Sequence, residues 1–249
     1  MSLFASGGVK KYLFYAVGEI TLVVIGILIA LQINNWNTNR IERSREHNIV
    51  QLISQEIAFN SSYVENWIKN CNSKLDVAIK LVNLTGSSPQ PISSDSLGSY
   101  LGRVFGLALF TPTTNHFNRI VNGDEINYIT HDSLKFLLGE LNNSYKSTEA
   151  FFEFISNKYV TQKWKLIENG VMNFAYFDYW GNRLDLRGFD KIDGDRFERN
   201  YNELLSSQGF ESVVMSQINY LQFFIEHLEA MTIVMEDLQE FIDHNYSDN

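Results

Sequence analysis

The first apolar segment is continuous rather than periodic. Residues 12–33 read YLFYAVGEITLVVIGILIALQI, and a helix of that length spans about 33 Å at ~1.5 Å per residue, which matches the hydrocarbon core of a bilayer. Tyr12 and Tyr15 stand at one end and Trp36 at the other, where amphipathic rings meet lipid headgroups. The sequence therefore predicts a transmembrane helix over 12–33, preceded by a short N-terminal tail, 1–11.

A cleaved signal peptide is the alternative interpretation of this segment, because Lys10 and Lys11 precede the apolar run. The run is longer than the apolar region of a signal peptide, and no small-x-small cleavage site follows it. The pattern favours a span that is retained in the protein.

Beyond the span the pattern becomes periodic. No glycine or proline lies between Trp36 and Leu84, so the membrane helix is predicted to continue outward as one rod until Gly86-Ser87-Ser88-Pro89 interrupts it. Apolar residues at spacings of three, four or seven mark one face of this rod. They are Ile53, Ile57, Val64, Trp67, Cys71, Leu75, Ala78 and Val82.

Two more long helices are predicted. Thr130 is expected to cap a helix with an apolar stripe that ends near Asn169-Gly170. The clearest pattern lies in the C-terminal segment, where steps of four and three form a heptad-like seam typical of bundle core. Its members are Phe210, Val214, Gln217, Leu221, Phe224, Leu228, Met231, Met235, Leu238 and Ile242.

Shorter elements are expected to connect the long ones. They are a helix from the Ser93/Ser94/Asp95 cluster to about Phe110, a short helix capped by Thr113 or Thr114 and ending near Gly123, a turn or brief extended piece over 124–129, an irregular aromatic segment over 171–195, and a helix over about 196–206.

Together these segments predict an all-α fold. One N-terminal transmembrane helix continues into an antiparallel helical bundle, and the bundle domain occupies 34–249.

Within the span, Glu19 is the most informative residue. Glu19, Gly26 and Ala30 lie on one helical face, and Gly26 and Ala30 form a small-xxx-small step that permits close contact between helices. Three interpretations of the acid stay open: it remains neutral or reaches the interface without a role, it bonds to another membrane helix, or it relays protons.

Charge excludes one class of partner and leaves the orientation open. The net charge is −9, with 20 Lys+Arg against 29 Asp+Glu, so we expect no nucleic-acid binding. Lys10 and Lys11 before the span nearly balance Arg40, Arg43 and Arg45 after it, so the distribution of positive charge does not select a topology. One cysteine, Cys71, cannot form a disulfide within the chain.

No standard catalytic motif is present, including the phosphate-binding loop, the serine nucleophile elbow and the zinc helix. The five histidines are scattered, and the acidic cluster around Gly194 lacks the spacing of a calcium loop. We therefore expect a non-enzymatic protein with no cofactor and no metal site.

The aromatic segment near residue 180 has two interpretations. Phe177, Tyr179 and Trp180 could form a partner or ligand surface, since tyrosine and tryptophan are enriched at interfaces. The alternative, which we favour, is that these rings cover the end of the bundle core.

Two stretches resemble a known family. Lys11–Ile20 and Val24–Asn37 form a long, specific match to the N-terminal signature of a family of uncharacterised single-pass membrane proteins of Bacteroidetes-type bacteria. A looser similarity covers Phe110–Thr114 and the residues up to Leu134, where members show a proline-led short helix, a glycine turn and an isoleucine-rich start to the next helix. The resemblance implies an inner-membrane protein with a cytoplasmic N-terminus and a helical domain outside the cytoplasm, and it implies no known activity.

These observations predict a membrane-anchored scaffold or accessory subunit of a larger cell-envelope complex. Its expected partners are the lipid bilayer and other membrane subunits or a second copy of itself. The alternatives are an extracytoplasmic sensor that binds a ligand, and a stator-like subunit that uses its intramembrane carboxylate.

Overall fold

The computed structural model describes residues 6–106, 109–168 and 202–246, and within them it confirms the all-α prediction. The elements are α1 (Ser6–Val82), α2 (Ser94–Val104), α3 (Asn115–Val121), the 3-10 helix η1 (Asp124–Tyr128), α4 (Asp132–Glu168) and α7 (Gln208–Tyr246). No strand occurs in these three ranges.

The predicted rod is a single helix. α1 contains 77 residues, a length of about 115 Å at ~1.5 Å per residue. It ends at Val82, just before the predicted interruption, where Gly86 has φ 131°. Only glycine adopts that backbone conformation without strain, so this residue turns the chain away from the helix axis.

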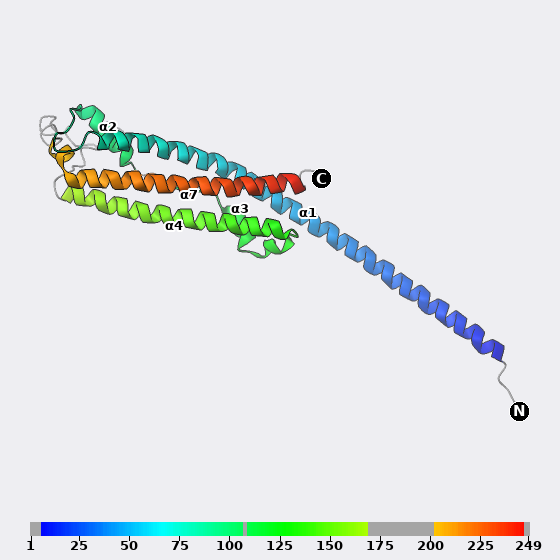
Figure 1. Ribbon diagram of the computed structural model, residues 1–249. Helices are drawn as coiled ribbons and strands as arrows, with labels where there is room; N and C mark the ends of the chain where they lie inside the picture. Colours follow the sequence, from blue (N-terminus) through cyan, green and yellow to red (C-terminus); the bar gives the residue numbers. More distant parts are fainter. Residues whose placement is uncertain (1–5, 107–108, 169–201, 247–249) are drawn as a thin grey trace, which may run out of the picture.

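α7 packs against both the bundled part of α1 and α4 (Figure 1), and α1 meets α4 through side chains such as Trp67 and Phe152. α7 runs antiparallel to α1 and α4, as the predicted bundle requires. α1 and α4 run in the same direction, because the connection over 83–131 returns along the bundle before α4 begins (Figure 1). This return cannot be inferred from periodicity, which fixes a helix but not the path of the chain between helices.

Several boundaries differ from the predicted ones. α2 ends at Val104 rather than near Phe110, although Ser93 is its N-cap as expected and its Oγ accepts from the Ser96 amide at 3.3 Å. The segment over 124–128, predicted as a turn or extended piece, is a 3-10 helix. Local sequence defines such short elements weakly, because their contacts with the long helices decide where they stop.

Two predicted threonine caps also behave differently. Thr114 is the N-cap of α3, yet its side chain makes no capping bond to the backbone. Thr130 does not cap α4, which begins at Asp132. In both places a glutamate from α1 supplies the carboxylate, as described below.

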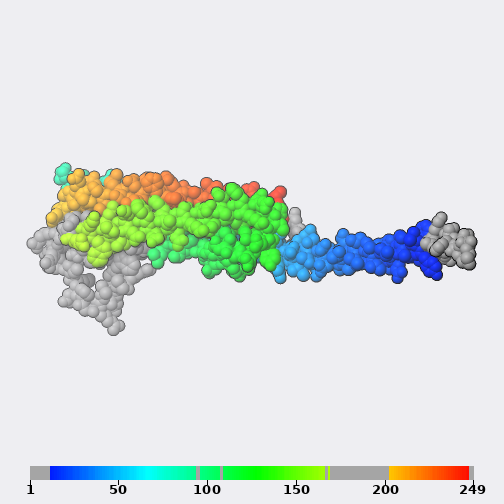
Figure 2. Space-filling view, turned by 90° about the horizontal axis from the view of Figure 1, so that it is seen from below, coloured from blue at the N-terminus to red at the C-terminus, as the bar shows by residue number. Residues whose placement is uncertain are grey.

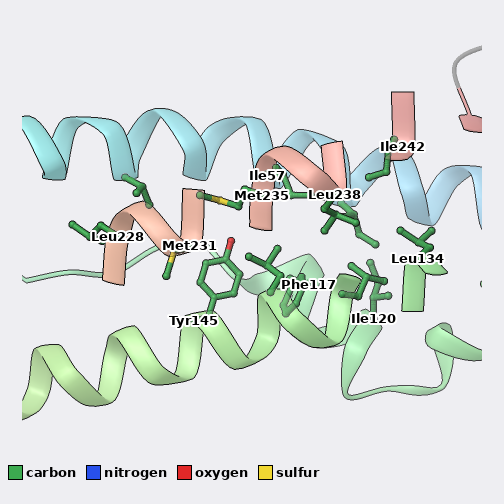
Figure 3. Close-up of a cluster of buried hydrophobic side chains, with 14 of the residues drawn as sticks. Ile57, Phe117, Ile120, Leu134, Tyr145, Leu228, Met231, Met235, Leu238 and Ile242 are labelled. Carbon is green, nitrogen blue, oxygen red and sulfur yellow. The ribbon is translucent and has the colours of Figure 1, made fainter. Parts of the chain in front are cut away.

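The core forms two clusters, and Figure 3 shows part of the larger one. On α1 the stripe predicted from sequence is buried or half-buried, from Ile53 to Val82. On α7 the predicted seam is buried at every position except Leu221, which is half-buried. A second cluster forms at the far end, where Leu97, Leu101 and Phe105 meet α7.

Some predictions lie outside the described residues. They are the irregular segment over 171–195 with Phe177, Tyr179 and Trp180, the acidic cluster around Gly194, and the start of the helix predicted over about 196–206. Residues 202–206 are helical, in agreement with the end of that helix.

Candidate functional site

α1 has two regions with opposite environments. Every residue from Tyr12 to Arg45 is exposed, and we call 12–45 the arm. The arm projects from the bundle with no other described part of the chain beside it (Figure 2). Its most apolar window has a mean hydropathy of 2.3 and none of it is buried, so the helix is long and apolar enough to cross a membrane.

Over residues 12–33 the exposed surface of the arm is largely apolar, and exposed apolar side chains occur on every side of the helix. Tyr12, Phe14 and Leu22 are 80%, 80% and 74% exposed, and their neighbours on every face are also apolar and exposed. Soluble proteins rarely expose a contiguous apolar surface of this extent to water. A bilayer accounts for such a surface, because lipid contacts all faces of a helix alike.

The predicted contact residues Glu19, Gly26 and Ala30 all lie on the arm. Because α1 is one uninterrupted helix, their spacings of seven and eleven residues keep them on one face, which we call the small-residue face. A Cβ atom placed on Gly26 would have nothing within 4 Å. The face is thus open, and a second helix could approach it closely.

The small-residue face points away from the bundle. Glu46, the first buried residue of α1, follows Glu19 by 27 residues, which is about 7.5 helical turns. The half turn places the buried stripe on the side of the helix opposite Glu19. α4 and α7 therefore do not stand in the way of a helix that packs against the small-residue face.

A polar stretch separates the span from the bundle. Residues 34–45 form about 18 Å of helix at ~1.5 Å per residue. In this stretch the Arg40 guanidinium lies 5.5 Å from the centre of the Trp36 ring, a pairing suited to the headgroup layer. The bundle would begin just beyond that layer.

A buried carboxylate, that of Glu46, lies at the boundary between the arm and the bundle. Glu46 is only 6% exposed, and its carboxylate accepts from the Thr130 amide at 2.7 Å and from the Tyr246 hydroxyl at 2.8 Å. The Thr130 hydroxyl adds a bond at 3.0 Å. Burial, with the bond to Glu46, raises the pKa of Tyr246. One side chain thus joins α1 to the start of α4 and to the end of α7.

An exposed contact reinforces this boundary. The Arg45 guanidinium donates to the Tyr128 hydroxyl at 2.9 Å and lies 5.1 Å from the centre of that ring. Since Tyr128 belongs to η1, the contact ties the connection to α1 where the helix leaves the bundle.

Two further buried polar residues of α1 hold the returning connection. The Glu56 carboxylate accepts from the amides of His116 and Phe117 at 2.9 and 3.1 Å, and so caps α3. The Asn60 amide nitrogen donates to the Thr113 carbonyl at 2.6 Å and to the Tyr145 hydroxyl at 2.7 Å. Burial raises the pKa of Tyr145 to about 12. These bonds satisfy backbone groups that would otherwise be buried without partners.

Sequence reasoning missed Glu46, Glu56 and Asn60 as structural residues. A signal was present, because Glu46 and Asn60 fall on the same seven-residue register as Ile53 and Trp67. A polar residue at a position of an apolar stripe either shows that the position is not buried or is a buried group with hydrogen-bond partners. Here the partners are provided by the connection, whose path the sequence did not define.

In the part of the chain that the structure describes, no three histidine, cysteine, aspartate or glutamate side chains come together as metal ligands. The contacts of Glu46 and Glu56 are hydrogen bonds to the protein itself, so these carboxylates serve the packing of the bundle.

Comparison with protein families gives one match. Residues 19–99 match a family of unknown function (DUF6090). The matched range contains most of the predicted span, the bundled part of α1 and the first half of α2, and it leaves out α4 and α7. The looser similarity over 110–134 also lies outside it. No curated protein and no solved structure matches the chain.

Proposed function

We propose that this protein is a membrane-anchored helical scaffold or accessory subunit of a larger cell-envelope complex, with no catalytic activity of its own. In this proposal residues 12–33 cross the bacterial inner membrane, and the small-residue face docks against another membrane helix. The bundle contacts partners on the other side of the headgroup layer.

The observation that carries the proposal is the direction of the small-residue face. By ideal helix geometry Glu19, Gly26 and Ala30 lie on the side of α1 opposite its buried stripe, and all three are exposed. A partner helix could therefore pack along the span while the bundle stays on the outer side of the pair. Association of membrane helices favours such small residues, and a carboxyl group can add a bond between helices.

The proposed topology places the N-terminus in the cytoplasm and the bundle in the periplasm. The resemblance to single-pass inner-membrane proteins supports this orientation. Alkaline phosphatase joined to the C-terminus tests it, since that enzyme becomes active only outside the cytoplasm. An active fusion is expected, and an inactive but stably expressed one would place the bundle in the cytoplasm.

The decisive experiment compares two glycines of the same span. Gly26→Leu adds bulk to the small-residue face, whereas Gly18→Leu adds the same bulk about 100° around the helix from Glu19. Each variant is extracted from its native membrane in mild detergent, and the mass and composition of the complex are measured. We expect a partner at fixed stoichiometry with the natural chain and with Gly18→Leu, and loss of that partner with Gly26→Leu.

The partner is another membrane subunit or a second copy of this chain, and the measured composition identifies which. If the natural chain is extracted as a monomer, or if both leucine variants keep the partner equally, the proposal is wrong. Glu19→Gln separates the stator-like alternative, because it removes a proton-relay function while an amide can still bond between helices.

A sensor is the second candidate, and one observation favours it. α1 runs without interruption from the bundle into the span, so a shift within the bundle would move the membrane segment as a rigid body. A ligand in the bundle would then act on a partner through the small-residue face.

A further inference from the structure

A partly open cavity of about 70 Å³ is lined by residues of α1, α4 and α7 and by Val104 and Gly106 at the end of α2. Three aromatic side chains form its apolar walls. The rings of Phe152 and Phe224 each meet Trp67 nearly edge-on, with centroids 6.0 Å away in both cases. This arrangement fixes the walls in place, so the cavity is formed before any ligand enters it.

One side of the cavity carries a positive charge. The Lys74 ammonium donates to the Gly106 carbonyl at 2.8 Å, and both residues line the cavity. No carboxylate of the described residues forms an ion pair with Lys74. Burial lowers the pKa of Lys74, and the nearby Arg103 adds a second positive charge that acts in the same direction. An anion beside this ammonium would supply the missing counter-charge.

α7 contributes a polar group without a partner. Gln217 lines the cavity and is 7% exposed, yet its Nε2 atom has no hydrogen-bond acceptor. Buried amide groups are bonded in most proteins, and an exception points to an absent water or ligand. An acceptor placed in the cavity would satisfy it.

We propose that this cavity binds a small monocarboxylate of two or three carbon atoms, with its carboxylate between Lys74 and Gln217 and its alkyl group against Trp67, Phe152 and Phe224. The size follows from volume, since a cavity of roughly 150 Å³ holds benzene and this one is about half as large. The inference does not depend on the proposed scaffold function.

The test uses the full-length chain in detergent and propionate as the probe. Calorimetry measures binding, and thermal unfolding measures stabilisation, which rises with ligand occupancy. Propionamide is the matched control ligand, because it has the same shape without the charge. A concentration of about 10 mM is enough to fill a site of millimolar affinity. At this concentration we expect propionate to bind and to raise the unfolding temperature. We expect propionamide to do neither.

Variants assign the site. Lys74→Met and Gln217→Leu keep side-chain size and remove the polar group, and each should weaken propionate binding at least about tenfold. Lys80→Met removes an exposed lysine of the same helix and should leave the affinity unchanged. Because two independent variants are used, a failure of one to fold leaves the other as the test.

Three results would overturn the proposal. They are no binding of propionate at that concentration, equal binding of propionamide, and natural affinity in a folded Lys74→Met or Gln217→Leu variant. Loss of the membrane partner in the Gly26→Leu experiment has no bearing on any of them.

Discussion

The arm and the bundled part of α1 belong to one helix and share one backbone geometry, yet their surfaces follow different rules. Over 12–45 every side chain is exposed, and in the span apolar residues occur on all faces. Over 46–82 a single stripe is buried and the opposite side is polar or exposed. The contrast follows the surroundings of each region: the span is apolar enough to cross a membrane and has no other described part of the chain beside it, whereas the second region packs against other helices on one side.

Polar residues inside the two apolar regions differ in the same way. On the bundled part, Glu46, Glu56 and Asn60 are buried and all have partners within the chain. On the span, Glu19 is exposed, and no other described part of the chain lies beside the arm (Figure 2). The buried polar side chains of the bundled part of α1 are thus bonded within the chain, whereas the acid of the span is exposed.

The largest expected effect comes from separating the two regions. Removal of residues 1–38 should move the protein from the membrane fraction to the soluble fraction, because every apolar residue of the span is lost and residues 12–38 are all exposed. Cell fractionation measures the distribution, and circular dichroism checks that the bundle stays helical. A truncated protein that remains in the membrane would show that the bundle itself binds lipid.

The next largest effect is expected from replacing a buried carboxylate of the bundle. Glu56→Ala leaves the N-terminal amides of α3 without their acceptor and should lower the free energy of unfolding by about 3 kcal/mol. Glu65→Ala is the matched control on the same helix, since Glu65 makes only an exposed pair with Lys69, and it should change stability by less than about 1 kcal/mol. Chemical denaturation measures both. Equal effects would mean that Glu56 contributes no more than a surface residue.

Alkaline pH should weaken the bundle through Tyr145. Burial raises its pKa to about 12, above the value of ~10 in an unfolded chain. The folded state therefore holds the proton more tightly than the unfolded chain. The stability that protonated Tyr145 contributes is complete below pH 10 and is lost as the pH rises toward 12. Between pH 10 and 12 the free energy of unfolding of the natural chain should fall by about 1.4 kcal/mol per pH unit through this residue, and Tyr145→Phe should remove that fall. An unchanged pH dependence in the variant would contradict this assignment.

The smallest effect is expected at the boundary itself. Arg45→Ala removes a hydrogen bond and a cation–π contact to Tyr128, both on the surface, and should lower the free energy of unfolding by roughly 0.5–1 kcal/mol. Arg43→Ala is the comparison variant, because Arg43 is exposed and lies over no aromatic ring of the described residues. A loss as large as that of Glu56→Ala would place the boundary among the main determinants of stability.

Local patterns predicted the long helices well. The absence of glycine and proline predicted α1 as one rod, and the seam on α7 predicted its buried residues from Phe210 to Ile242. Both depend on helical periodicity, which involves residues three or four positions apart. The face formed by Glu19, Gly26 and Ala30 was predicted for the same reason, and its role in docking stays a prediction.

The capping of the short elements was predicted less well, because it involves residues far apart in sequence. Thr130 has the residue type of a helix cap, but its amide and hydroxyl bond to Glu46 instead. Helix caps chosen from local sequence assume that the nearest polar side chain serves the exposed amides. In this bundle a carboxylate from α1 is closer in space.

By itself, the sequence determined the class of fold, the membrane-type span and the residues that face the core of each long helix, because each follows from spacing along one helix. Only the tertiary structure decided the shared direction of α1 and α4 and the bonds of Glu46, Glu56 and Asn60. These depend on how the connection returns along the helices, and that path is set by packing and by the need to satisfy buried backbone groups.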